Sequence, residues 1–209
     1  MAVTLQARNL TLELLRQQFG LRVTTAYDFF PEWMASPASL TAAEQERLDQ
    51  VKAHFLHLSQ AFPLMEDAIK MVIVSPLLDL AGFYDDPFHF RTEASTEVSA
   101  LDGETLVRGQ IDVLVTLNDL WIVVIESKNM GIGLSVGIPQ ALGYMLAHPE
   151  AERPSYGLVT NGSEFVFLKL QHRPAPQYTT SRVFSMLSPM NELYDVLKIL
   201  KTLGQVAQA

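Results

Sequence analysis

Apolar residues recur at helical spacing near the start of the chain. Leu12, Leu15 and Phe19 follow one another at intervals of three or four positions, which predicts a short helix over residues 10–19. Residues 20–40 mix aromatic side chains with glycine and proline, and this mixture predicts an irregular segment.

A second helical pattern begins at Thr41. Glu44 follows three residues later, which is the spacing of a capping box and predicts a helix from there to about Ala61. Pro63 is suited to open a further helix, because the N–H that proline lacks would have no partner in a first turn. The apolar run after it predicts a core helix with Pro76 near its end or at a kink. The residues expected to face the core in these two helices are Leu48, Val51, Phe55, Leu58, Leu64, Ala68, Val72 and Leu77.

The hydrophobic period changes from helical to alternating after residues 81–90, which look turn-like. Residues 92–100 alternate, residues 102–104 (Asp-Gly-Glu) predict a turn, and residues 106–117 predict a strand. Residues 120–128 predict a second strand that is buried, because both of its faces are apolar.

The last third of the chain predicts a helix, a hairpin and a second helix. Residues 138–147 look helical, residues 155–170 read as a hairpin with its turn at Asn161-Gly162, and residues 191–204 form an amphipathic pattern. The order of helices, strands, helix, hairpin and helix predicts an α/β domain with a central mixed sheet, extra N-terminal helices and a C-terminal helix.

Length and composition indicate a globular chain with a substantial core, since it has 209 residues and is 48% hydrophobic. We expect residues 1–61 to form a helical extension packed on a core of residues 62–209, within a single compact domain. The sequence contains no secretion-signal pattern, no apolar run of membrane-spanning length and no cysteine, so we expect a cytoplasmic protein without a membrane partner. The net charge of −8 argues against binding nucleic acid through bulk positive charge.

Three charged residues interrupt the two apolar strands, although buried charge is costly unless it is paired or holds a metal. Glu126 and Lys128 are two residues apart and therefore point to one face. A two-residue turn at Asn118-Asp119 would direct Asp112 to the opposite face, whereas a three-residue turn or one bulge would pair it with Glu126. We predict the second register, which would bring two carboxylates together as a site for a hard cation.

These residues resemble the signature of the PD-(D/E)xK nuclease superfamily. Asp112 and the run Glu126-Ser127-Lys128 match its core, with Ile111 where the name of the superfamily has a proline. The resemblance covers roughly residues 62–170 and is strongest to the N-terminal nuclease domain of type I restriction enzyme R subunits. The 209 residues contain no P-loop pattern, so we expect no ATP-driven motor in this chain.

Three further residues extend the resemblance. Gln140 and Tyr144 match the Q-x-x-x-Y element of the RecB-like branch, and Glu66 matches a glutamate on the helix that precedes the sheet in many members. The resemblance implies a restriction-endonuclease-like core and a Mg²⁺- or Mn²⁺-dependent DNA endonuclease that acts in restriction, repair or defence. It implies DNA as the partner and leaves open other restriction-modification or repair subunits and a homodimer.

The resemblance also implies roles. Asp112, Glu126 and the backbone carbonyl of Ser127 would hold the metal, with Glu66 as a further candidate ligand. Lys128 would orient a water molecule or stabilise charge on the phosphate. Gln140 and Tyr144 would contact the DNA backbone or brace Lys128. Separately from the resemblance, Arg108 shares a strand face with Asp112 and could contact phosphate.

Other interpretations remain open for each of these residues. Glu66 could simply pair with Lys70 one helical turn away, Gln140 and Tyr144 could serve ordinary helix packing, and Arg108 could form a structural salt bridge. The whole fold could also bind DNA or a protein without cutting, and the acidic net charge keeps this alternative open.

Two unrelated motifs are also present. Residues 133–137 match the Gly-x-Ser-x-Gly elbow of serine hydrolases, but the partners available to it are only His148 or His172 with Glu150 or Glu164, and we expect a glycine-flanked loop there. His54 and His57 have the spacing of a metal-binding pair on a helix, but no third ligand is evident, and we expect them on the helix surface.

Overall fold

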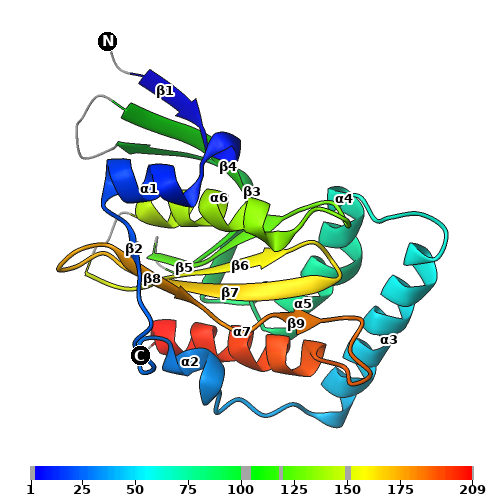
Figure 1. The fold of residues 1–209 in the computed structure, drawn as a ribbon. Coiled ribbons are helices and arrows are strands. Elements are labelled where there is room, and N and C mark those ends of the chain that lie inside the picture. Colours follow the sequence, from blue (N-terminus) through cyan, green and yellow to red (C-terminus); the bar gives the residue numbers. More distant parts are fainter. Residues whose placement is uncertain (1–2, 100–104, 118–119, 149–151, 209) are drawn as a thin grey trace.

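A large mixed sheet lies between two layers of helices in the computed structural model, which describes residues 3–99, 105–117, 120–148 and 152–208 (Figure 1). The order of strands across the sheet is β1 (Val3–Gln6), β4 (Thr105–Leu117), β5 (Leu120–Ser127), β6 (Ser155–Thr160), β7 (Glu164–Gln171), β8 (Gln177–Thr180) and β2 (Arg22–Val23). β3 (Phe88–Ser99) also pairs with β4, and β9 (Phe184–Ser185) with β7. The pairs β1–β4, β5–β6 and β2–β8 are parallel and the others antiparallel. The expected α/β class with a central mixed sheet is therefore confirmed.

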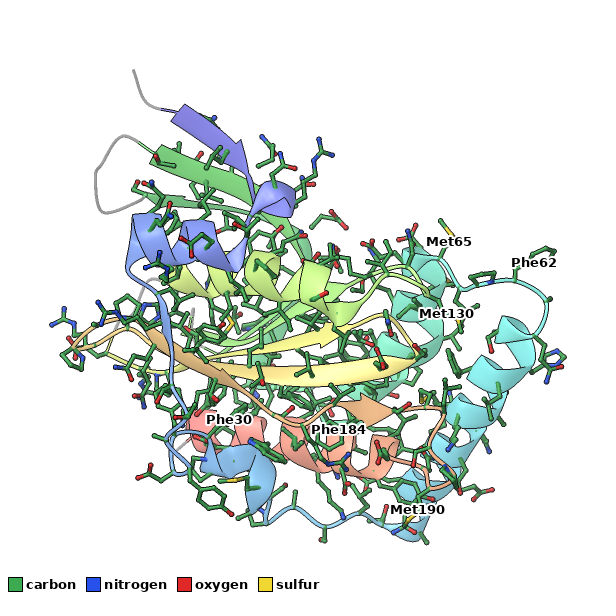
Figure 2. All side chains as sticks on the ribbon, in the orientation of Figure 1. Phe30, Phe62, Met65, Met130, Phe184 and Met190 are labelled. Carbon is green, nitrogen blue, oxygen red and sulfur yellow. The ribbon has the colours of Figure 1, made fainter. Side chains whose placement is uncertain are left out.

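Each face of the sheet has its own hydrophobic cluster. One face is covered by α1 (Leu12–Phe19) and α6 (Leu134–Leu146), and the other by α5 (Ser75–Leu80) and α7 (Leu193–Gln208) (Figure 1). α3 (Ala42–Ser59) packs outside this second layer, against α7 and the residues that precede α5. Successive strand residues alternate between the clusters: Val124 packs with the α6 side, and Val123 with the α7 side. Figure 2 shows Phe30 and Phe184 beside α7, where both are buried.

The N-terminal helices follow the sequence pattern closely. Thr11 accepts a hydrogen bond from the backbone N–H of Leu14 at the start of α1, and Gly20 ends that helix in the left-handed conformation. α3 begins with the expected capping box of Thr41 and Glu44. The first 61 residues are not only helical, however, since they supply β1 and β2 as well as η1 (Ala7–Asn9) and the short helix α2 (Pro31–Met34).

The helix expected after Pro63 begins later and is interrupted. α4 (Glu66–Ile69) leads into η2 (Lys70–Val74), a π-helical turn, which continues as α5. The prediction that Pro63 opens the helix is therefore wrong. Pro76 lies in the first turn of α5, just after the π-turn, where a widened turn relieves the clash between a proline ring and the preceding turn.

The π-turn also shifts the buried stripe of this segment. Ala68 and Val72, which we expected in the core, are half-buried, whereas Ile69 and Ile73 are fully buried. In α3, Leu48, Val51 and Phe55 are buried as expected, but Leu58 is exposed. A regular helical period cannot follow the buried stripe through η2, because a π-turn adds a residue to the repeat.

The strands begin earlier than the sequence suggests. β3 starts at Phe88, inside the segment 81–90 that looked turn-like, and burial then alternates over Ala94–Ser99 as expected. The turns predicted at 102–104 and at Asn118-Asp119 lie outside the described residues. The register of β4 and β5 shifts between Val115 and Thr116, and this shift is the bulge that the sequence argument called for.

The C-terminal elements agree with the pattern, with small shifts. The hairpin of β6 and β7 is confirmed, but its turn lies one residue later than predicted. Asn161 N–H donates to the carbonyl of Glu164, so that Gly162 and Ser163 are the central turn residues. α6 begins at Leu134 rather than at residue 138, and α7 is the expected amphipathic helix. Within the described residues, no helix combines the length and apolar character needed to cross a bilayer.

The packing of α3 gives a stability prediction. Leu48→Ala removes a fully buried side chain from the α7-side cluster, so it should lower the free energy of unfolding by about 2–5 kcal/mol. Leu58→Ala, on the exposed side of the same helix, should cost less than about 1 kcal/mol. Denaturant unfolding of both variants measures the difference. Equal losses would contradict the packing of α3 against η2 and α7.

Candidate active site

The bulge in the β4–β5 hairpin sets the register on which the site depends. Val113 pairs with Ile125, and the next pair in the same register is Asp112 with Glu126. Leu114, two residues from Asp112 along β4, packs on the α6 side of the sheet. The predicted register, which places Asp112 opposite Glu126, is therefore confirmed. Ile111 and Leu114 both pack on the α6 side, so the alternation of faces along β4 is interrupted at Asp112.

Asp112 is held by the strand that carries Glu126. Its Oδ2 accepts hydrogen bonds from the backbone N–H of Ser127 at 2.7 Å and from the Ser127 hydroxyl at 2.9 Å. Both residues are buried. Hydrogen bonds to a carboxylate are stronger than those between neutral groups, so they fix both the position of Asp112 and the hairpin register.

Glu126 is a buried carboxylate with half of its hydrogen-bonding capacity unused. Its side chain is 1% exposed, and Oε1 accepts a hydrogen bond from the Lys128 ammonium. Oε2 is buried and has no hydrogen-bond partner among the described residues. Burial, and then the nearby charge of Asp112, raise the pKa of Glu126 to about 8, while Lys128 opposes the rise. An unused buried oxygen of this kind requires an explanation.

A chain of hydrogen bonds runs from Lys128 into α6. Lys128 Nζ donates to Gln140 Oε1 at 3.0 Å, and Gln140 Nε2 donates to the Tyr144 hydroxyl at 2.8 Å. Tyr144 in turn donates to the backbone carbonyl of Gln110 at 2.8 Å. Tyr144 is 2% exposed and burial raises its pKa, so it remains a neutral donor. Of the two expected roles of Gln140 and Tyr144, the structure favours the bracing of Lys128.

Gly137 allows α6 to approach this site closely. A Cβ at residue 137 would lie 2.7 Å from a methyl carbon of Val159, 3.5 Å from Lys128 Cγ and 3.6 Å from Glu126 Cγ. A larger residue would therefore push α6 away from the sheet. Gln140 lies one turn later on the same helix, so the close approach at Gly137 also brings Gln140 within hydrogen-bonding distance of Lys128.

Glu66 reaches the same carboxylates from a separate element. Asn129 Oδ1 accepts from the backbone N–H of Glu66 at 2.8 Å, which satisfies the start of α4 in place of a capping side chain. Burial, and then Asp112, raise the pKa of Glu66, so the two carboxyl groups lie close enough to interact. Lys70 also lies 3.7 Å from Glu66, so both interpretations of this glutamate have structural support. Met65 and Met130, the neighbours of this contact, lie at the same end of the molecule in Figure 2.

A groove of about 630 Å³ lies beside the brace. Gln140 and Tyr144 line one side of it, and η1 and the strands β3 and β4 line the others. Arg108 lies in this groove, where its guanidinium pairs with Glu97 across β3 and β4 at 2.8 Å. The structure therefore favours the salt-bridge interpretation of Arg108.

The donor atoms suit a hard cation, although the set of side-chain ligands is small. In the described part of the chain, no three histidine, cysteine, aspartate or glutamate side chains come together with metal-ligand spacing. Mg²⁺ needs fewer, since it usually keeps several waters and takes one or two protein carboxylates. Asp112 and Glu126 supply these, and the unused Oε2 of Glu126 is an oxygen that a cation would satisfy.

The remaining motifs do not form sites. Ser135 is exposed in the first turn of α6 and does not follow directly from β5, so the serine-hydrolase elbow does not form. His172 lies 3.2 Å from the Ser155 hydroxyl and beside His148, and burial lowers the pKa of His172 to about 4. Glu150 lies outside the described residues. His54 and His57 are exposed on α3, as expected.

Several residues that hold the site in position were not predicted from the sequence. The Ser127 hydroxyl, Asn129 and the carbonyl of Gln110 each hold a candidate residue in position. Ser127 and Asn129 flank Lys128 in the sequence, so their adjacency was a usable signal. The role of Gln110 depends on α6 packing over β4, which no local pattern reveals.

No protein-family model matches this chain, and the comparison with curated proteins gives no match either. The geometry of the site therefore carries the functional argument.

The raised pKa of Glu126 predicts how stability depends on pH in chelator. The folded state keeps its proton to about pH 8, whereas the unfolded chain loses it near 4.5, so this contribution to stability is present at low pH and is lost as the pH rises through 8. Glu126→Gln keeps the shape but cannot ionise. The variant should melt higher than the wild type at pH 9, and the gap should close at pH 5.

Thermal melts of both proteins from pH 5 to pH 9 test this expectation. Glu46→Gln, exposed on α3, controls for the loss of one carboxylate. A gap that is the same at every pH would contradict a buried, proton-binding Glu126.

Proposed function

We propose that this protein is a divalent-metal-dependent DNA endonuclease of the PD-(D/E)xK type, with a restriction-endonuclease-like core. The main support is the buried Glu126 carboxylate, which lies opposite Asp112 with Lys128 on the same side of the sheet. A fold does not need two buried carboxylates at such a position for stability, and functional sites are where local rules are broken.

The proposed metal ligands are Asp112, Glu126 and the backbone carbonyl of Ser127, with Glu66 as a further candidate. When bound, Mg²⁺ or Mn²⁺ would polarise the scissile phosphate and lower the pKa of an attacking water. The order of elements supports this assignment, since both strands that carry the acids and the helix that follows belong to one consecutive β4–β5–α6 unit.

Lys128 is proposed to act on the phosphate directly. Its ammonium is held between Glu126 and Gln140, and a cation fixed in a partly buried site stabilises negative charge that develops on phosphate oxygens. Gln140 positions Lys128, and Tyr144 positions Gln140 from a buried place in α6. We assign Tyr144 a positioning role rather than a DNA contact.

The proposal takes DNA as the substrate and the cytoplasm as the compartment. Other restriction-modification or repair subunits, or a second copy of this chain, remain candidate partners. A fold that binds DNA without cutting it is the outcome to be separated from the proposed enzyme, and a cleavage assay separates the two.

Cleavage assays test the proposed activity. Asp112→Ala, Glu126→Ala and Lys128→Ala should each lower Mg²⁺- or Mn²⁺-dependent cleavage by roughly a hundredfold or more, because each removes a ligand or a charge needed in the transition state. The substrates are single-stranded, duplex and branched DNA. Lys198→Ala, on α7, is the control and should cut as the wild type does.

Circular dichroism must show that each variant keeps the native fold. Cleavage that survives all three changes, or that persists in chelator, would exclude the proposed nuclease. DNA binding without any cleavage by the wild type would favour the silent binding fold.

Metal binding should also appear as thermal stabilisation. A ligand at a hundredfold excess over its dissociation constant stabilises the folded state by about 2.7 kcal/mol. For a chain of this size the melting temperature should then rise by roughly 5–11 °C. Mn²⁺ should produce this shift in the wild type, whereas Asp112→Asn should lose most of it. Equal shifts in both proteins would mean that Mn²⁺ binds elsewhere.

A further inference from the structure

Lys70 lies among carboxylates on the side of the site away from α6. It is the first residue of the π-turn, and its side chain is 20% exposed. Its ammonium lies 3.1 Å from Asp67, 3.6 Å from Glu93 and 3.7 Å from Glu66. It is also near enough to Asp112 to interact with it electrostatically. Lys70 and Lys128 therefore lie beside the same cluster of carboxylates and approach it from opposite sides.

Glu93 has an unusual backbone at this point. Among the described residues it is the one non-glycine residue with a positive φ, at 52°. It lies in β3 directly across from Asp112, since its neighbours Thr92 and Ala94 pair with Val113 and Ile111. Backbone strain of this kind persists only where the surroundings hold it, and it concentrates at functional sites.

Glu93 connects Lys70 to the groove beside Gln140 and Tyr144. The Glu93 carboxylate lies 3.6 Å from the Lys70 ammonium, which also interacts with Asp112, and Glu93 lines the groove that reaches Gln140 and Tyr144. Lys70 is therefore joined to the lining of this groove by its ion pair with Glu93.

Lys128 is not free to take up additional negative charge at this site. Glu66, Asp112 and Glu126 lie together in a protein of net charge −8, and Lys128 is already bonded to Glu126 and Gln140. A DNA strand brings further negative charge to this place. A lysine that is partly exposed, carries three rotatable donors and is held loosely by several carboxylates can turn to an incoming phosphate.

We propose that Lys70 binds a backbone phosphate of the substrate strand next to the scissile one, and that Glu93 holds Lys70 beside the groove until the strand arrives. The inference rests on the proposed nuclease function and adds a substrate contact to it. Lys70 acts here as a phosphate-binding residue, and Glu93 as a positioning residue.

The salt dependence of DNA binding tests this contact. Each neutralised phosphate contributes about 0.9 to the slope of log K against log salt concentration for duplex DNA, and about 0.7 for a single strand. Lys70→Met should lower the magnitude of the slope by about that amount, and should weaken binding of a labelled oligonucleotide roughly tenfold. Ca²⁺ replaces Mg²⁺ in the measurement, since it takes the same kind of oxygen ligands.

Two variants serve as controls. Lys70→Arg keeps the positive charge and should keep the slope. Lys198→Met removes one positive charge from α7 and should leave both slope and affinity unchanged. If Lys70→Met does not fold, as judged by circular dichroism, Lys70→Gln takes its place, because it keeps a polar end for the neighbouring carboxylates.

The outcomes separate this inference from the proposed function. A wild type that binds and cuts DNA, with a slope that Lys70→Met leaves unchanged, would refute the Lys70 contact and leave the nuclease in place. An equal loss of slope in Lys198→Met, or a lost slope in Lys70→Arg, would also refute it. A wild type that neither binds nor cuts DNA would refute both.

Discussion

Two carboxylates held at the end of a buried strand are the constraint on which the rest of this structure depends. Asp112 and Glu126 meet only because one extra residue in β5 sets the hairpin register, and Ser127 then holds that register with two hydrogen bonds to Asp112. Without the bulge, Asp112 would pair with Ile125 and not with Glu126. The register of the β4–β5 hairpin therefore brings the two carboxylates together, and the hydrogen bonds of Asp112 in turn stabilise that register.

The elements around the carboxylates serve to hold cations and helices near them. Gly137 lets α6 approach, so that Gln140 reaches Lys128, while Asn129 ties the start of α4 to the same strand end. Each contact joins segments that are distant in the chain, and each involves a group that burial makes costly to leave unpaired. A polar network of this kind is rigid when its bonds are made, which suits a site that must present charges at fixed positions.

The sequence predicted the elements whose cause is local. The capping box of Thr41 and the apolar face of α7 appear as expected, and even the bulge followed from the charges of the hairpin. What it did not predict depends on distant contacts. β1 and β2 form by pairing with the edges of β4 and β8. The positive φ of Glu93 occurs where β3 lies beside Asp112 and Lys70. Pro63 failed as a helix start because Asn129, which lies 63 residues from Glu66, sets where α4 begins.

The π-turn at Lys70–Val74 has a consequence for how this segment tolerates insertions and deletions. A π-turn is equivalent to one extra residue in an α-helix, and one residue corresponds to about 100° of rotation around the helix axis. The buried stripe of α5 is anchored in the core, so its orientation is fixed. Deletion of a single residue within the turn would restore a regular helix and swing Glu66 about a quarter of a turn away from Asp112. One residue of the π-turn therefore sets the rotation of Glu66 around the helix axis relative to the buried side chains of α5.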